Sequence, residues 1–277
     1  MTNTGQTTVC PAVYAMKALP DSFLQSLVAW LDDENTLGIA ITGSFARSEG
    51  GLYCDVDLTH YVRQKPAAET EPYRLRFVDD HLVSLKITTL EAEYASLRNP
   101  EQAIWTIPGL RQLCILLDKD GSIAALKETA AKATWEPLQA AADAYASREL
   151  SSYTEEIHKI LGGLTQRDES KTLYAVWGLT RGLSNALLTQ RGVLISTENA
   201  YIDLAQNAAG RTSGWTRQFR LAIGLDPLLP GEPAFVGYGV AGLHLYRETV
   251  AIFRHILSPE DADVVNRTLE IIAGAGY

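Results

Sequence analysis

The sequence predicts an α+β protein, with an N-terminal mixed β-sheet domain over residues 1–135 and a C-terminal α-helical bundle over residues 136–277. In the first half, short apolar runs end in Gly, Asn or Asp and alternate with helical patterns. From about Leu138 onward, apolar residues recur at helical spacing instead. The composition, 46% hydrophobic and 21% charged, is typical of a globular protein with a substantial core.

The expected elements of the first half follow from these runs. Helices are expected over 21–30, 91–97 and 122–132. Strands are expected over 37–42, 52–62, 74–78, 82–88 and 111–117. The residues Asp79-Asp80-His81 have the character of a hairpin turn between two of these strands.

The second half is expected to be helical throughout. One apolar stripe at helical spacing comprises Leu150, Tyr153, Ile157, Ile160, Leu161 and Leu164. The expected breaks between helices are Gly162-Gly163, Gly192, Gly210 and the segment 226–233. A second stripe, expected in the bundle core, comprises Trp177, Leu179, Leu183 and Leu187.

Some polar and aromatic residues allow two interpretations. Surface solvation is one role for Arg181, Asn185, Gln190 and Arg191, and the lining of a polar cleft is the other. Tyr174 and Trp177 belong either to the core or to a surface that stacks on a base or sugar. A further set, expected to cover the sheet, comprises Trp105, Ile107 and Leu110.

The charge and cysteine content narrow the class of protein. A net charge of −9 and a pI near 5.1 argue against a nucleic-acid partner and are compatible with a cationic one. Cys10, Cys54 and Cys114 form neither a disulfide framework nor a zinc pattern, which favours a reducing cytoplasm. No apolar run approaches the ~20 residues of a membrane span, and the first ten residues lack the order of a signal peptide.

The segment ITGSFARSEGGLYCDVDLTHYV, residues 41–62, carries the clearest chemical signal. Residues i and i+2 of a strand point to the same face, so Asp55 and Asp57 are expected to direct two carboxylates to one place. Val56 and Leu58 then face the sheet core. Because two carboxylates repel each other without a cation between them, their pairing predicts a magnesium site.

The residues before the two aspartates fit the other half of such a site. Gly43 permits close approach of the backbone to a ligand, and Ser44 offers a hydroxyl and an N–H group to a phosphate. A short helix beginning near Phe45 would add free N–H groups. Arg47 is a further candidate phosphate partner.

Gly43-Ser44 followed by Asp55-Val56-Asp57 resembles the nucleotidyltransferase signature of the DNA polymerase β superfamily. The stretches GSFAR and DVDL are most similar to its small-molecule branch, the aminoglycoside and lincosamide nucleotidyltransferases. The motif covers about fifteen residues. The domain order of these enzymes, a small mixed-sheet nucleotidyltransferase domain and then a helical bundle, matches the layout expected for residues 1–135 and 136–277.

The resemblance implies a reaction and its site residues. Asp55 and Asp57 would be catalytic residues that hold Mg²⁺, which binds the phosphates of a nucleoside triphosphate, with ATP the expected one. Ser44 and the Gly43 backbone would grip the β- and γ-phosphates. An acceptor hydroxyl would attack the α-phosphorus, and pyrophosphate would leave.

One feature of the family pattern is missing. Many members carry a third carboxylate on a later strand, but the outward residues of the strand 82–88 are Ser84, Lys86 and Thr88. Lys86 is either a cation for the triphosphate or a surface lysine. In some small-molecule branches a glutamate of the helical domain is the general base, so the missing acid does not by itself argue against activity.

The segment YTEEIHKILGGL, residues 153–164, supplies candidates for that base. Glu155 lies opposite the apolar stripe, with Lys159, and is the preferred catalytic base. Glu156 lies on the flank and is the second candidate, and His158 is a third. The alternative for Glu155 is a solvated ion pair with Lys159 at i,i+4.

The sequence therefore favours a cytoplasmic, magnesium-dependent nucleotidyltransferase. It would move a nucleoside monophosphate onto a hydroxyl of a small molecule, with an aminoglycoside-like, polycationic antibiotic as the favoured acceptor and antibiotic resistance as the consequence. One alternative is modification of protein hydroxyls, as in antitoxin-like relatives, and another is a non-catalytic nucleotide-binding scaffold. Neither nucleic acid nor membrane is an expected partner, and a homodimer is left open.

Overall fold

The computed structural model describes residues 19–64, 73–228 and 230–277. The chain forms two compact units. The sheet unit comprises the described residues up to Ala92 together with Gly109–Glu128. The helical unit comprises Glu93–Pro108 and the described residues of Thr129–Tyr277. Residues 93–108 thus pack with the helical unit, although the sequence places them in the first domain.

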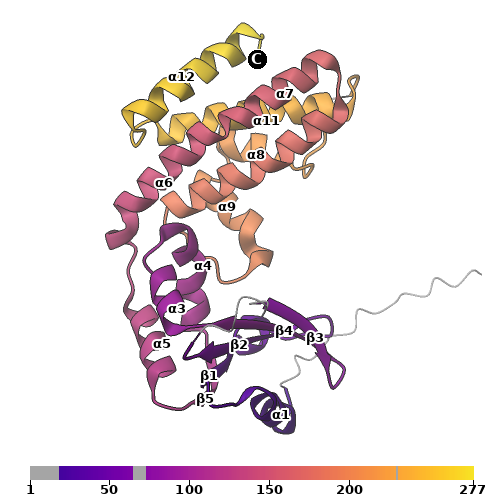
Figure 1. Ribbon diagram of the computed structural model, residues 1–277. Helices are drawn as coiled ribbons and strands as arrows, with labels where there is room; N and C mark the ends of the chain where they lie inside the picture. Colours follow the sequence, from indigo (N-terminus) through magenta and orange to yellow (C-terminus); the bar gives the residue numbers. More distant parts are fainter. Residues whose placement is uncertain (1–18, 65–72, 229) are drawn as a thin grey trace, which may run out of the picture. The chain divides into compact units, whose positions relative to one another are not determined.

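The sheet unit contains a five-stranded mixed sheet in the order β3-β4-β2-β1-β5 (Figure 1). The strands are β1 (Thr36–Ile41), β2 (Val56–Val62), β3 (Tyr73–Val78), β4 (His81–Thr88) and β5 (Cys114–Asp118). β2 runs antiparallel to β1 and parallel to β4, while β3 and β5 form the two edges. The predicted strands are present, with β2 shorter and β5 shifted by three residues at its start.

The β3–β4 hairpin has the predicted turn. Val78 pairs with His81, so the turn consists of Asp79 and Asp80 alone. Both aspartates have positive φ angles, of 44° and 63°, as the central residues of a type I′ turn require. This turn returns the chain next to β2 and sets β4 parallel to it, which brings Ser84 opposite Asp57.

The two faces of the sheet are covered differently. Helices α1 (Asp21–Leu31), α2 (Gly43–Ala46) and α5 (Ser122–Lys132) belong to this unit at least in part. Leu27 of α1 packs with Val56 and Leu58 on one face. Because strand residues alternate, Asp57 and Ser84 lie on the face opposite α1. The predicted inward direction of Val56 and Leu58 is confirmed.

The helical unit is built from long helices. They are α4 (Pro100–Arg111, to Pro108), α6 (Gln139–Ser152), α7 (Thr154–Gln166), α8 (Glu169–Gln190), α9 (Tyr201–Ala209), α10 (Gly214–Ala222), α11 (Ala234–Phe253) and α12 (Pro259–Gly274). Shorter elements are α3 (Leu90–Ser96) and the 3₁₀ turns Glu136–Leu138 and Glu198–Ala200. Figure 1 shows α7, α8 and α11 side by side, in agreement with their shared core.

The core of the helical unit is apolar and continuous. Leu179 of α8 is fully buried with Ile160 of α7 and Leu245 of α11. The buried indole of Trp215 donates a hydrogen bond to Thr249 Oγ1 at 2.9 Å, which satisfies its one polar atom. Burial of this size is what an α-helical bundle requires, and the α+β class predicted from the sequence is confirmed.

Several local predictions need correction. β2 begins at Val56, so Asp55 precedes the strand instead of lying on it. α4 was not predicted, and Arg111 ends it instead of beginning a strand. Gly162 and Gly163 lie within α7, where Gly163 allows close packing against α8, while Gly192 and Gly210 do follow helix ends.

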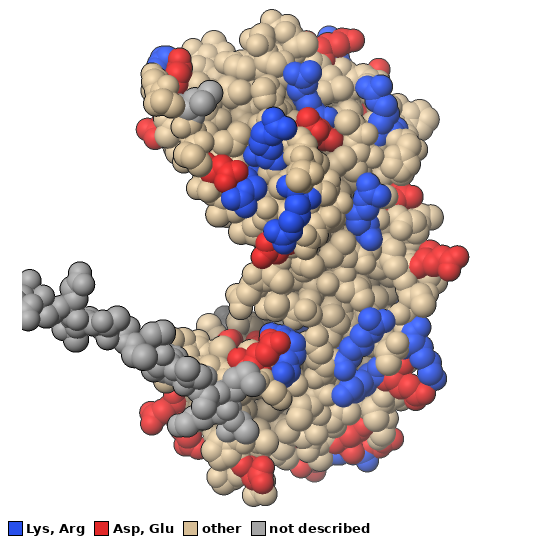
Figure 2. Space-filling model, turned by 180° about the vertical axis from the view of Figure 1, so that it is seen from behind, with Lys and Arg blue, Asp and Glu red and all other residues tan. Residues whose placement is uncertain are grey.

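The surface shown in Figure 2 carries Lys and Arg side chains interspersed with Asp and Glu. Among the described residues, no helix is both long and apolar enough to cross a membrane. Cys54 and Cys114 are free thiols, and Cys10 and the first ten residues lie outside the described residues.

Candidate functional site

Two neighbouring segments hold Asp57 in place, β4 and the loop after β1. Ser84 of β4 donates a hydrogen bond from Oγ to Asp57 Oδ1 at 2.9 Å. Ser84 is only 3% exposed, so its hydroxyl has little competition from water. The backbone N–H of Thr42 donates to the carbonyl of Asp57 at 2.8 Å, which joins the loop after β1 to the start of β2. The carboxylate of Asp57 is therefore fixed before any ligand binds.

Gly43 lies directly against this carboxylate. Its φ angle is +65°, a region that side chains rarely adopt, and a Cβ atom added there would overlap Asp57 Oδ2. The glycine after β1 is thus explained by two requirements at once, a left-handed backbone and a close approach to Asp57. The role of Gly43 in binding a nucleotide stays a prediction.

The donor set around Asp57 fits a magnesium ion. Asp55 and Asp57 are both half-buried, two residues apart, and carry hard carboxylate oxygens. The described residues contain no group of three His, Cys, Asp or Glu side chains arranged to hold a metal. A magnesium ion commonly uses one or two carboxylates and takes its other ligands from water and substrate phosphates, so two carboxylates suffice for this ion.

The two predicted phosphate-binding residues, Ser44 and Arg47, differ in their surroundings. Ser44 lies in the first turn of α2, next to Gly43. Arg47 forms an ion pair with Glu49, Nε to Oε2 at 2.7 Å, and contacts Gln112 Oε1 at 3.4 Å. A phosphate contact from Arg47 would require this guanidinium to exchange Glu49 for the phosphate.

β4 determines what replaces the missing third carboxylate. Ser84 lies opposite Asp57 in the parallel register, and Lys86 lies opposite Thr59. Ser84 and Lys86 share one face of β4, with the Lys86 side chain exposed. The outward face of β4 therefore carries a hydroxyl that bonds to Asp57 and a lysine two residues along the strand, instead of an acid.

The candidate general bases lie on α7 in the helical unit. The Glu155 side chain is 75% exposed and pairs with Lys159 Nζ at 2.9 Å, as its predicted place opposite the apolar stripe requires. Glu156 is 17% exposed and also contacts Lys159 at 2.9 Å. Its Oε2 is buried with no hydrogen-bond partner within the described part of the chain. Hydrogen bonds from Lys159 to Glu156 and Glu155 raise the pKa of the lysine. His158 is exposed.

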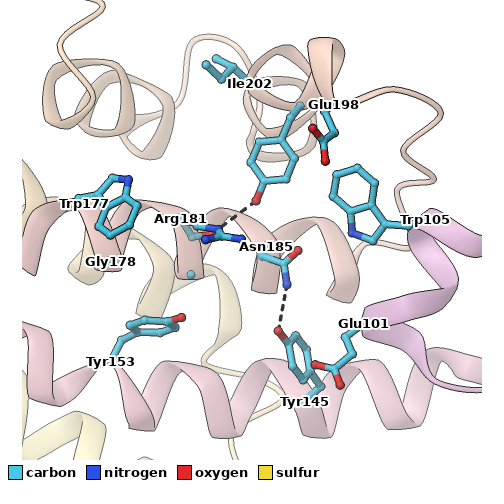
Figure 3. A pocket seen from close by; sticks show the side chains of 12 residues that line it. Glu101, Trp105, Tyr145, Tyr153, Trp177, Gly178, Arg181, Asn185, Glu198 and Ile202 are labelled. Atoms are coloured by element: carbon cyan, nitrogen blue, oxygen red, sulfur yellow. Dashed lines mark hydrogen bonds between the residues drawn. The ribbon is translucent and has the colours of Figure 1, made fainter. Parts of the chain in front are cut away.

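The helical unit contains a pocket with a volume of about 890 Å³ (Figure 3). Five aromatic side chains line it, namely Trp105, Tyr145, Tyr153, Trp177 and Tyr201. The charged and amide side chains are Glu101, Arg181, Asn185 and Glu198. A concave, largely aromatic site with a few polar groups has the character of a small-molecule site, and its volume falls in the usual range.

Hydrogen bonds fix the polar wall of this pocket. Asn185 donates from Nδ2 to the Tyr145 hydroxyl at 3.0 Å, as Figure 3 shows. Burial, with the nearby Glu149 carboxylate, raises the pKa of Tyr145 far above its usual range. Burial and then the charge of Glu101 raise the pKa of Glu149. The wall therefore holds neutral phenols next to two carboxylates that repel each other.

Two of the pocket aromatics correct the sequence predictions. Trp177 is 62% exposed and lines the pocket instead of the bundle core, while Leu179, Leu183 and Leu187 are buried as predicted. Trp105 was expected to cover the sheet, but it lies in the helical unit and stacks on Tyr201 with ring centroids 6.1 Å apart. The cleft-lining alternative holds for Arg181 and Asn185, whereas Gln190 bonds to Asp143 at 3.0 Å.

Known proteins match this chain in structure but not in sequence. No protein-family model matches it, and no curated protein sequence matches it. A solved structure of a nucleotidyltransferase-like protein from Exiguobacterium sibiricum matches 83% of this chain and 74% of its own, with a TM-score of 0.50 and 12% sequence identity. The chain has a nucleotidyltransferase-like fold. At 12% identity this likeness concerns the fold alone.

Proposed function

We propose that this protein is a magnesium-dependent nucleotidyltransferase that transfers a nucleoside monophosphate from a nucleoside triphosphate to a hydroxyl of a small molecule. The observation that carries the proposal is the fixed carboxylate of Asp57, bonded to Ser84 and packed against Gly43 on a nucleotidyltransferase-like fold. A carboxylate that is oriented in advance, with a second carboxylate two residues before it, has a clear use in binding a metal–triphosphate complex.

In this proposal Asp55 and Asp57 hold the magnesium ion, which when bound supplies positive charge to the triphosphate. Gly43 lets the chain approach the phosphates, and Ser44 donates to them from its hydroxyl and its N–H group. Lys86 supplies a further positive charge from the same face of β4. Arg47 is the second basic candidate, after release from Glu49. ATP is the first nucleotide to test.

A small-molecule acceptor is favoured over a protein acceptor by the pocket of the helical unit. Its 890 Å³ and five aromatic side chains are suited to enclosing a compact molecule, whereas a protein hydroxyl needs an open surface. The resemblance makes an aminoglycoside-like antibiotic the first class of acceptor to screen. Glu101 and Glu198 are available to its ammonium groups.

For the general base we retain Glu155 as the proposal, with Glu156 as the competitor. The ion pair of Glu155 with Lys159 must open before Glu155 can accept a proton from an acceptor hydroxyl. Glu155→Gln and Glu156→Gln, each compared with Glu270→Gln on the exposed side of α12, separate the two. The general base is the glutamate whose Gln variant loses about 10²-fold in turnover while its nucleotide affinity is unchanged.

The deciding experiment is calorimetric titration of the full chain with ATP, with and without magnesium. The wild type is compared with the double variant Asp55→Asn/Asp57→Asn, which keeps the shape of the site and removes both charges. We expect magnesium-dependent binding in the wild type and its loss in the double variant. Equal binding by both proteins, or none by either, would leave the non-catalytic scaffold as the better proposal.

A further inference from the structure

We infer that the pocket of the helical unit binds a small organic molecule that carries one protonated amine next to a flat ring. The inference deepens the proposed function, since it names the class of acceptor. The binding test of this inference needs neither nucleotide nor magnesium, so its result is independent of the test of the proposed function. The inferred ligand departs from the polycationic class named first for screening, because the charged lining side chains are two carboxylates and one guanidinium.

The acidic end of the pocket is formed by two elements that are distant in sequence. Glu101 and Trp105 lie one turn apart on α4, and Glu198 begins the 3₁₀ turn before α9. Figure 3 shows the Trp105 indole between the carboxylates of Glu198 and Glu101. An ammonium group at this end would be attracted by the charges of both carboxylates and by the face of an indole, the aromatic ring that attracts cations most strongly.

The groups behind this end keep it preorganised. Trp105 is stacked nearly parallel to Tyr201, with an interplanar angle of 6°, and Asn99 donates to Glu101 Oε1 at 3.2 Å. Glu149 of α6 lies near Glu101 of α4. Burial, together with the Glu101 charge, raises the pKa of Glu149. A bound cation would offset the repulsion between these two carboxylates, in addition to the partial offset that Arg148 gives to Glu149.

The opposite end of the pocket is flat and aromatic. Figure 3 shows Trp177 and Tyr153 on either side of Gly178 of α8. The Tyr153 ring lies so close to Gly182 that a Cβ there would overlap it. Rings flanking a glycine backbone suit stacking on a planar group. The lining residues of this end include no carboxylate, and the Glu156 carboxylate, which lies within 4 Å of where a Gly178 Cβ would be, is paired with Lys159 at 2.9 Å.

Arg181 decides between one amine and several. It lies between the two ends in Figure 3, and the lining side chains therefore carry two carboxylates, Glu101 and Glu198, and one guanidinium. A molecule with amines along its whole length would bring one of them to Arg181, which costs Coulomb energy. A molecule with one amine at the acidic end avoids this contact.

The charged lining groups are Glu101 of α4, Arg181 of α8 and Glu198. Glu149 of α6 does not line the pocket, and the groups that act with it are Glu101, Arg148 and the hydroxyls of Tyr153 and Tyr145. The pKa of Glu149 is raised, first by burial and then by the Glu101 charge. Amine binding is therefore expected to strengthen as pH rises and Glu149 ionises, and to be accompanied by proton release.

The test compares tyramine with tyrosol, which has the same ring and a hydroxyl in place of the amine. The full-length chain is titrated with each, and binding is followed by tryptophan fluorescence, since Trp105 and Trp177 line the pocket, and by calorimetry. We expect tyramine to bind about 10-fold tighter than tyrosol. Glu101→Gln should remove most of that preference, while the surface variant Glu270→Gln should retain it.

Further arms separate the two ends and the two proposals. Trp177→Ala should weaken both probes equally, and the triamine spermidine, which has no ring, should bind more weakly than tyramine. Asp55→Asn/Asp57→Asn should bind tyramine as the wild type does. Equal affinity for tyramine and tyrosol, or tighter binding of spermidine, overturns the inference whether or not ATP binds. Loss of ATP binding alone overturns the proposed function and leaves the pocket assignment standing.

Discussion

The site around Asp57 and the pocket of the helical unit are built in opposite ways. Asp57 is fixed by neighbours close in register, Ser84 opposite it on β4 and Gly43 after β1. The pocket instead gathers residues from α4, α6, Tyr153 between α6 and α7, α8, the turn before α9, and α9 itself. Function that rests on strand register leaves a compact sequence motif, whereas function assembled from several helices leaves isolated residues.

The largest expected effect breaks one site and leaves the other intact. Asp57→Asn keeps an oxygen for the Ser84 hydroxyl but removes the charge, so magnesium-dependent ATP affinity should fall more than about 10²-fold. Tyramine affinity should stay at the wild-type value. Calorimetry with each ligand measures both. A similar loss of tyramine binding would mean that the two sites are not independent.

Gly43→Ala should be the next most damaging change. Its φ of +65° strains any side chain, and the new methyl group would displace the Asp57 carboxylate. We expect a loss of about 1–3 kcal/mol in the free energy of unfolding and a large loss of ATP affinity. Gly109→Ala is the matched control, because nothing lies within 4 Å of a Cβ there. Urea unfolding of both variants checks the difference in stability.

The predictability of the fold also differs between the two units. The strands were found because each is a short apolar run closed by turn residues, and the Asp79-Asp80 turn fixed one hairpin. α4 was missed because Pro108 lies inside it and its apolar and polar residues are weakly separated around the helix. That miss concealed the attachment of residues 93–108 to the helical unit, since single-sequence patterns carry no long-range contacts.

The candidate sites follow the same division. Gly43, Ser44, Asp55 and Asp57 were predicted from spacing, but the bond from Ser84 depends on a parallel register that the sequence does not state. For Trp177 a signal was present. At 100° per residue it lies about 160° from Leu179 on α8, so both could not face one core. Glu101 and Trp105 gave no such signal, because their helix was missed.

A smaller effect sharpens the account of the Asp57 site. Ser84→Ala removes the hydrogen bond to Asp57 Oδ1 and leaves both carboxylates in place. We expect magnesium-dependent ATP affinity to fall about 10-fold, as for other groups that orient a metal ligand. Ser84→Thr, which keeps the hydroxyl, should recover part of the loss. If Ser84→Ala binds ATP as the wild type does, Asp57 needs no orientation from β4.

The smallest expected effect concerns the stability of the pocket. Burial and the Glu101 charge raise the pKa of Glu149 in the folded protein. An acid with a raised folded-state pKa contributes stability that is present below its unfolded pKa and is lost as pH rises through the folded pKa. Ionisation of Glu149 as pH rises therefore weakens the helical unit relative to acid pH. Glu149→Gln should remove this dependence and keep an acceptor for the Tyr153 hydroxyl.

The expected gain from Glu149→Gln is less than about 1 kcal/mol, because Glu149 is only half-buried and solvent screens its charge. Thermal unfolding across the acid-to-neutral range is the measurement, with Glu270→Gln on exposed α12 as the control. The advantage of Glu149→Gln over the wild type should grow as pH rises and then level off. A constant difference at every pH would mean that Glu149 titrates normally, and the pocket would then have no repulsion for a bound amine to relieve.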